Sequence, residues 1–207
     1  MIPTLVAIAG GTGSGKSTLC YSLEKKFPIQ IQVIHFDDYH KKSEDIPIHF
    51  GMQNWDHPDA INFNLLRNDL IRLKSSKQIT IQTKDRTINP NYKYTKARIP
   101  IKIKPKGIIL IEGFMVLFDP KSREMYDETL FLKLDHQTRL KRRTKFLDIE
   151  YEKRILIPMH EKYVESTTNF AEHIINVTNL SEKQLLSKVE KILGLTKAPI
   201  RDGPGKA

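Results

Sequence analysis

The chain has 207 residues, a length that suits one domain with a sizeable core. It carries a formal net charge of +10, which indicates an anionic partner such as a nucleotide or a nucleic acid. Its one cysteine excludes an internal disulfide, and no apolar run reaches the roughly 18–20 residues that span a bilayer. The first expected strand also leaves no room for a preceding signal peptide, so we expect a cytoplasmic protein without a membrane partner.

Apolar segments of strand length alternate with amphipathic segments, which predicts an α/β domain with a parallel sheet. The expected strands are residues 4–9, 32–36, 107–111, 129–134 and 173–177. The expected helices begin near residues 17, 59, 121, 136, 158 and 181. We expect a single domain over residues 1–196. Residues 197–207 contain two prolines and two glycines and are expected to form a loose tail.

A glycine-rich segment follows the first strand, and its sequence IAGGTGSGKST at residues 8–18 fits the pattern G-x-x-x-x-G-K-[ST]. Such a loop lets backbone N–H groups converge on phosphate oxygens at the start of a helix. Lys16 would reach the β- and γ-phosphates of ATP or GTP, and Ser17 would offer its hydroxyl to Mg²⁺. The predicted nucleotide-binding residues are Gly10, Gly11, Thr12, Gly13, Ser14, Gly15, Lys16, Ser17 and Thr18.

Carboxylates stand where two further strands end. The second strand runs into VIHFDDYHKK, where Asp37 and Asp38 could accept a proton from a hydroxyl or hold Mg²⁺. These aspartates could also ligate a metal with His35 and His40, but successive strand residues point to opposite faces, which disfavours that alternative. The third strand runs into GIILIEGF, and Glu112 at its tip needs a cation, so we expect it in the Mg²⁺ site.

The segment between these strands contains NWDHPDAINF at residues 54–63. Asp56 could accept hydrogen bonds from sugar hydroxyls, and Trp55 either forms a wall of the sugar pocket or packs in the core. Asp59 follows a His-Pro turn and is interpreted as the cap of the next helix.

Residues 78–105 interrupt the alternation of strands and helices. Isoleucines alternate with polar residues at 79 and 81 and again at 99, 101 and 103, which predicts an antiparallel hairpin. This insertion could cover a substrate or form a contact between subunits.

A basic run, RLKRRTK at residues 139–145, leads into an expected short lid at about residues 144–156. Arg139, Arg142 and Arg143 share one broad helix face, which is either a solvated basic face or a set of phosphate contacts. The run and the net charge also allow a nucleotide-dependent switch or a nucleic-acid-binding protein. No guanine-reading N-K-x-D motif and no nucleic-acid motif accompany them.

Four motifs in this order resemble the phosphoribulokinase/uridine kinase family of P-loop kinases: GGTGSGKST, the strand-tip Asp37, NWDHPDA and LIEGFMVLF. TRLKRR and IPMHEKYVESTTNFAEHII are similar to the family's helix beside the lid and its final helix–strand unit. The resemblance covers roughly residues 5–177 and implies a P-loop fold with a lid, which is shorter in this sequence than in the family. It also implies phosphoryl transfer from ATP or GTP to the 5′-hydroxyl of uridine or cytidine.

The resemblance also implies roles for single residues. Asp37 matches the general base, Asp56 the acceptor of ribose hydroxyls, Glu112 the carboxylate linked to Mg²⁺ and Arg143 a lid arginine that meets the phosphates. His40 stands where the family usually has an aromatic residue facing the substrate. The predicted site residues are, as catalytic groups, Asp37, Lys16 and Arg143; as substrate contacts, Asp56, Asp38, His40, Trp55 and Tyr94; and as metal contacts, Ser17, Glu112 and Asp37.

The sequence departs from the family pattern in three places, and the first two leave the acceptor open. DDYHK at residues 37–41 replaces the common DSFY, and Asp-Asp before an aromatic is also seen in nicotinamide riboside kinases. The insertion lacks the family's Tyr and His that read the base, and Asn89, Tyr92 and Tyr94 stand nearby. The lid lacks the family's arginines, and Lys145 and Arg154 are the candidates to take their place. The family also suggests a homo-oligomer, and we expect no nucleic-acid partner.

Overall fold

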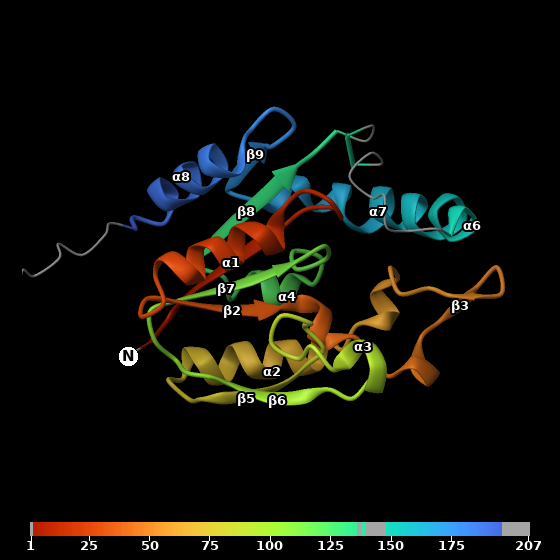
Figure 1. The fold of residues 1–207 in the computed structure, drawn as a ribbon, viewed down its shortest axis with the longest axis horizontal. Coiled ribbons are helices and arrows are strands. Elements are labelled where there is room, and N and C mark those ends of the chain that lie inside the picture. The colour runs from red at the N-terminus through yellow and green to blue at the C-terminus, as the bar shows by residue number, and fades with distance from the viewer. Residues whose placement is uncertain (1, 136–137, 140–147, 196–207) are drawn as a thin grey trace, which may run out of the picture.

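The computed structural model describes residues 2–135, 138–139 and 148–195 (Figure 1). Its centre is a five-stranded sheet in the order β2-β7-β1-β8-β9, and each neighbouring pair is parallel. The predicted parallel sheet is therefore confirmed. The strands are β1 (Thr4–Ala9), β2 (Ile31–His35), β7 (Ile108–Gly113), β8 (Glu128–Lys133) and β9 (His173–Asn176), so each expected strand exists with bounds within about two residues.

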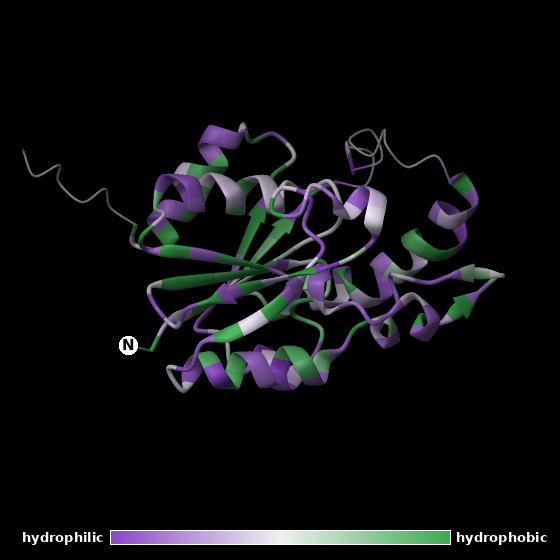
Figure 2. Cartoon of the chain, turned by 60° about the horizontal axis from the view of Figure 1, so that its bottom comes forward, coloured by the Kyte–Doolittle hydropathy of each residue, from purple (hydrophilic) through white to green (hydrophobic). Residues whose placement is uncertain are grey.

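Helices cover both faces of the sheet (Figure 1). Val6 and Ile8 of β1 face a core shared with α1 (Lys16–Lys26) and α8 (Glu182–Ile192), whereas Leu5 and Ala7 face a core shared with α2 (Phe63–Lys74). A strand that is buried on both faces needs apolar residues at every position, and Figure 2 shows the strands as hydrophobic segments inside the molecule. This requirement explains why the three central strands, β1, β7 and β8, appear in the sequence as nearly continuous apolar runs.

The helix starts depend on single capping residues. Ser181 begins α8 as expected, in a reciprocal capping box with Gln184. The prediction that Asp59 caps the next helix is wrong, because the Asn62 side chain caps α2 by accepting the Leu65 N–H. Asp59 lies instead in a short 3₁₀ helix, η3 (Pro58–Ala60), with an exposed side chain. The helix expected near residue 121 is α4 (Pro120–Arg123), and the start predicted near residue 136 falls outside the described residues.

The insertion at 78–105 forms the expected antiparallel pair, in which β5 (Ile79–Thr83) pairs with β6 (Ile99–Ile103). Ile79, Ile81 and Ile103 are buried in the same core as α2. The loop that joins the two strands contains the one-turn helix α3 (Tyr92–Thr95). The pair therefore extends a core layer, while its connecting loop reaches towards the carboxyl edge of the sheet.

The described part of the expected lid is helical. It comprises α6 (Ile149–Tyr151), the π-helical turn η4 (Glu152–Leu156) and α7 (Ile157–Tyr163), followed by the 3₁₀ helix η5 (Glu165–Phe170). The helix expected near residue 158 thus begins earlier, at Ile149. The remaining short elements are η1 (Phe36–Tyr39), η2 (Ser43–Asp45), β3 (Ile48–His49) and β4 (Met52–Gln53). Within the described ranges, no helix is long and apolar enough to cross a membrane.

Candidate active site

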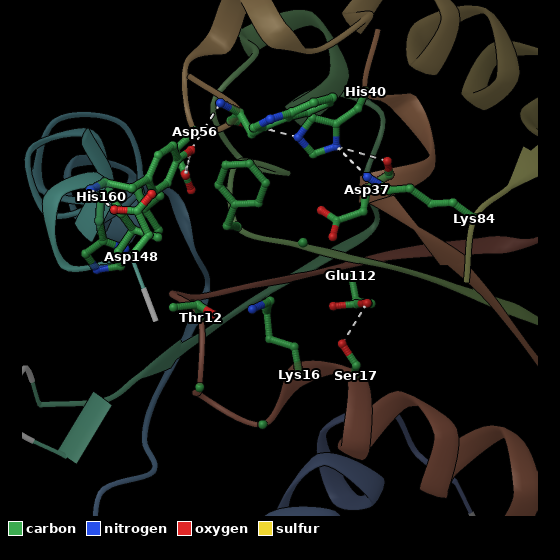
Figure 3. A pocket seen from close by; sticks show the side chains of 18 of the residues that line it. Thr12, Lys16, Ser17, Asp37, His40, Asp56, Lys84, Glu112, Asp148 and His160 are labelled. Atoms are coloured by element: carbon green, nitrogen blue, oxygen red, sulfur yellow. Dashed lines mark hydrogen bonds between the residues drawn. The ribbon is translucent and has the colours of Figure 1, made fainter. Parts of the chain in front are cut away.

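A cavity of about 1010 Å³ lies at the carboxyl edge of the sheet, where ligands bind in open α/β folds. The glycine-rich loop, the ends of β2 and β7, the segment around Trp55, the loop after β5 and the lid helices all contribute to its wall. Figure 3 shows side chains from these elements pointing into one space, with the glycine-rich loop on one side and Asp37, His40 and Asp56 on the other. The motifs that the sequence places far apart are therefore neighbours.

The glycine-rich loop has the backbone expected of a phosphate cradle. Gly13 and Gly15 have φ angles of 79° and 88°, in the left-handed region that glycine tolerates best. Gly15 is the N-cap of α1 and provides no side-chain cap, so the first N–H groups of this helix are available to a phosphate. Lys16 Nζ lies 3.1 Å from the carbonyl oxygen of Gly11. Of the predicted nucleotide-binding residues, Thr12, Gly13, Gly15, Lys16, Ser17 and Thr18 line the cavity.

Ser17 and Glu112 form the oxygen-rich corner of the cavity. The Ser17 hydroxyl donates to Glu112 Oε1 at 3.0 Å, and Glu112 is buried at the end of β7. Mg²⁺ takes oxygen ligands and keeps several of its coordination positions for water and phosphate. A hydroxyl and one carboxylate beside a phosphate cradle fit such an ion. No group of three or more His, Cys, Asp or Glu side chains arranged for a metal occurs in the described ranges.

The two neighbouring aspartates after β2 point in different directions. Asp37 lines the cavity, and Figure 3 shows its carboxylate between His40 and the glycine-rich loop. Asp38 is buried away from the cavity, where Oδ1 accepts the Lys84 N–H at 2.8 Å, and burial raises its pKa. The chain turns into the 3₁₀ helix η1 here, so adjacent side chains diverge. Of the two predicted contacts, the structure brings only Asp37 to the cavity.

His40, Trp55 and Phe114 form an aromatic wall. The His40 ring lies 5.6 Å from the Trp55 ring and 6.0 Å from the Phe114 ring, with which it is stacked. Its Nδ1 and Nε2 atoms each lie 3.0 Å from a backbone carbonyl oxygen, of Asp37 and Trp55 respectively. These contacts fix the ring at the cavity and occupy both of its nitrogens, so the alternative in which His40 ligates a metal is not supported.

Asp56 is held by the lid. The Tyr151 hydroxyl donates to Asp56 Oδ2 at 2.6 Å and accepts the Trp55 N–H at 3.1 Å. Both Asp56 and Tyr151 line the cavity. Sequence reasoning placed a lid here but missed Tyr151, because a single tyrosine in a helical segment carries no signal of its partner 95 residues away.

Lys84 is a second residue that the sequence did not reveal. It follows β5, lines the cavity, and its Nζ atom lies 3.3 Å from His40 Nδ1. Burial lowers the pKa of Lys84, and the nearby Asp37 carboxylate opposes that shift. Tyr94, the residue of the insertion that was expected at the substrate, is 74% exposed and does not line the cavity. The insertion thus reaches the site through Lys84 rather than through Tyr94.

His160 and Arg139 pack against the glycine-rich loop. A Cβ atom on Gly11 would lie 2.3 Å from His160 Cε1 and 3.2 Å from Arg139 Nη1. His160 Nε2 lies 2.8 Å from Glu165 Oε1, and Arg139 Nη1 lies 3.9 Å from the same oxygen. Both His160 and Arg139 are buried. The alternative in which Arg139 belongs to a solvated face is therefore wrong. His160 is an interior residue that also lines the cavity.

The remaining lid residues divide into two groups. Arg154 pairs with Glu150 at 2.7 Å with more than half of its side chain exposed, and it does not line the cavity. Arg142, Arg143 and Lys145 lie outside the described residues. The predicted role of Arg143 at the phosphates therefore stays a prediction.

Comparisons with known proteins agree with this geometry. Residues 5–180 match the model of the phosphoribulokinase / uridine kinase family. A uridine kinase of Clostridium botulinum is 33% identical over 186 residues, which cover 84% of this chain and 87% of the relative. A uridine kinase of Clostridium perfringens is 30% identical over 208 residues, which cover 93% and 97% of the two chains.

Solved structures show the same fold at lower identity. A possible uridine kinase from Bacillus stearothermophilus superposes with a TM-score of 0.63 and 19% identity over 85% of this chain and 90% of its own. Shikimate kinase from Acinetobacter baumannii superposes with a TM-score of 0.52 and 14% identity over 94% and 96% of the two chains. The chain belongs to the phosphoribulokinase/uridine kinase family, and it is an ATP-dependent kinase that transfers a phosphoryl group to an alcohol.

Proposed function

We propose that this kinase transfers the γ-phosphate of ATP or GTP to the 5′-hydroxyl of uridine or cytidine. One observation carries the proposal: the carboxylates of Asp37 and Asp56 line the same cavity as the phosphate cradle. A sugar held by Asp56 can present a hydroxyl to Asp37 while a triphosphate lies on the glycine-rich loop. The uridine kinases among the relatives support this acceptor class.

In the proposed reaction each residue acts on a stated group. The N–H groups at the start of α1 and the Lys16 ammonium bind the phosphates, and Lys16 neutralises charge on the transferred group. Asp37 orients the acceptor hydroxyl and takes its proton. Asp56, with Tyr151, holds the sugar hydroxyls. Arg143 would add a second positive charge at the phosphates.

Ser17 and Glu112 are the residues that would hold Mg²⁺, and Asp37, which lines the same cavity, would contact the water around the ion. Bound there, Mg²⁺ would neutralise charge on the phosphate oxygens. The closing of the lid helices over the cavity would exclude water from the reaction.

A riboside with another base is the second candidate acceptor. Asn89, Tyr92 and Tyr94, which stand near the place of the family's base-reading residues in the sequence, do not line the cavity. Lys84 and the wall of His40, Trp55 and Phe114 do. These residues do not by themselves select a pyrimidine over another base. Nicotinamide riboside and other small metabolites therefore belong in the test.

The test is a coupled assay with ATP or GTP and Mg²⁺ against uridine, cytidine, adenosine, nicotinamide riboside, pantothenate and ribulose 5-phosphate. We expect turnover with uridine or cytidine. Turnover with another acceptor alone would contradict the proposed substrate and leave the roles of Lys16, Asp37 and Glu112 intact. A lack of turnover with all six acceptors would contradict the proposed substrate and mean that this kinase uses an alcohol outside the panel.

We further propose a cytoplasmic protein that forms a homo-oligomer and binds no nucleic acid. Arg139, the one residue of the basic run that the structure describes, is buried beside the glycine-rich loop, which supports a role at the nucleotide site. Gel-shift titration at low salt would contradict this view if the protein bound DNA or RNA tightly.

A further inference from the structure

Glu112 has a second partner that the proposed reaction does not use. His35, at the end of β2, lies with Nδ1 2.8 Å from Glu112 Oε1, the same oxygen that accepts the Ser17 hydroxyl at 3.0 Å. His35 and Glu112 are both more than nine-tenths buried, at 6% and 7% exposure. Two donors on one oxygen fix the plane of the carboxylate. Figure 3 shows the other carboxylate oxygen on the side of Lys16.

The far side of the His35 ring faces a second carboxylate. His35 Nε2 lies 3.8 Å from Asp85 Oδ2, and Asp85 belongs to the loop that joins β5 to β6. Asp85 is itself fixed, because Oδ2 accepts the Tyr21 hydroxyl and Oδ1 accepts the Thr87 N–H at 2.8 Å. Tyr21 lies on α1, one turn after Ser17, and its ring is 5.3 Å from the His35 ring.

These contacts link four side chains in a row, in the order Tyr21, Asp85, His35 and Glu112. This row of side chains connects α1, the insertion and strands β2 and β7 at the corner where Ser17 and Glu112 lie. A histidine between two carboxylates is oriented by both, and the groups that orient a metal-linked carboxylate change metal affinity without touching the metal.

We propose that His35 is a positioning residue that holds Glu112 for a magnesium–nucleotide complex, and that Asp85 and Tyr21 orient His35 in turn. The insertion then contributes to the affinity for magnesium as well as to the acceptor wall. The inference rests on the proposed function in one respect, namely that Glu112 faces the magnesium of the bound nucleotide.

The test measures binding of a non-hydrolysable ATP analogue by calorimetry, with Mg²⁺ and with EDTA, and no acceptor is present. In His35→Ala we expect the affinity without metal to stay within about twofold of the wild type. The enhancement of affinity by Mg²⁺ should fall by about 10-fold, the lower end for loss of a group that orients a metal ligand. His35→Asn places an amide N–H near the position of Nδ1 and should restore part of the enhancement.

A merely structural role for His35 predicts a different result. Equal loss of affinity with Mg²⁺ and with EDTA, or an unchanged enhancement in His35→Ala, would overturn the proposal. Tyr21→Phe and Asp85→Asn should lower the enhancement in the same direction by a smaller factor, and they test the proposal if His35→Ala does not fold. If the enhancement of affinity by Mg²⁺ is unchanged in both Tyr21→Phe and Asp85→Asn, these residues do not orient His35 as proposed.

His173→Ala is the matched control. It removes another histidine near a glutamate, since His173 Nε2 lies 3.2 Å from Glu128 Oε2, and neither residue lines the cavity. In this variant the enhancement of nucleotide affinity by Mg²⁺ should equal that of the wild type. Because no acceptor is present, the wrong acceptor in the proposed function would leave this result unchanged. A wild-type protein that gains no affinity from Mg²⁺ would overturn the inference.

Discussion

The two sides of the cavity are built in different ways. The phosphate side comes from one short segment, residues 10–18, with Glu112 beside it, and much of its chemistry is backbone N–H groups. The acceptor side combines side chains from the turn after β2, the segment around Trp55, the insertion and the lid. A contiguous backbone site tolerates changes elsewhere in the chain. A site made of separate side chains depends on every segment that supplies one, and acceptor choice can change there while phosphate binding persists.

The largest effect should come from Asp37, where the two sides meet. Asp37→Asn removes the carboxylate that takes the proton of the acceptor hydroxyl, and we expect kcat to fall by about 10²–10⁴-fold. The affinity for nucleotide should stay within about threefold, because the phosphate side is unchanged. A coupled assay and calorimetry with the ATP analogue measure the two quantities.

Asp38→Asn is the matched control for this variant. It makes the same substitution one residue further along, and its amide oxygen can still accept the Lys84 N–H outside the cavity. We expect kcat within a few-fold of the wild type. Near-normal turnover in Asp37→Asn, or an equal loss in both variants, would remove Asp37 from the role of base.

Asp56 tests whether the acceptor side is energetically separate from the phosphate side. Asp56→Ala should raise KM for the acceptor by about 10–100-fold, the range for lost hydrogen bonds to a charged group, and leave KM for ATP unchanged. Tyr151→Phe keeps the carboxylate and removes one of its partners, so a rise of only about 2–10-fold is expected. An unchanged acceptor KM in Asp56→Ala would show that Asp56 does not hold the sugar.

Gly11 tests the contact between the glycine-rich loop and the lid helices. In Gly11→Ala the new Cβ atom would lie 2.3 Å from His160 Cε1, so the buried ring must move. Overpacking of this kind should lower the stability by about 1–2 kcal/mol and Tm by about 2–8 °C. The double variant Gly11→Ala/His160→Ala removes the clash, so its loss of stability should be smaller than the sum of the two single losses. Additive losses would mean that the ring does not press on the loop.

The sequence predicts the phosphate side better than the acceptor side for a physical reason. The loop motif, the apolar strands and Glu112 at a strand tip are local patterns, and the fold follows from their periodicity. Asp37 and Asp38 are equivalent in the sequence, and only the 3₁₀ turn after β2 separates them. Lys84, Tyr151 and His160 reach the cavity through tertiary packing, which no local pattern encodes.

The smallest expected effect concerns pH, and it acts on the same contact between loop and lid. Burial lowers the pKa of His160 below its ordinary value of 6.5; Glu165 opposes this shift and the cations Arg139 and Lys16 add to it. In the unfolded chain His160 therefore binds a proton at a higher pH than in the folded protein. The stability that it contributes is fully present above pH 6.5 and is lost as the pH falls towards the folded pKa.

His160→Gln isolates this contribution, because an amide can donate to Glu165 but does not titrate in this range. Urea denaturation at pH 7.0, 6.0 and 5.5 measures the unfolding free energy of both proteins. As the pH falls, this free energy should fall more steeply in the wild type than in the variant, by at most about 1.4 kcal/mol per pH unit. Glu165 also has a lowered pKa, through its bond to His160, but it titrates below pH 4.5, outside this window. Parallel pH profiles would mean that His160 is solvated in the folded protein. A steeper wild-type profile would mean that acid weakens the contact that joins the loop to the lid.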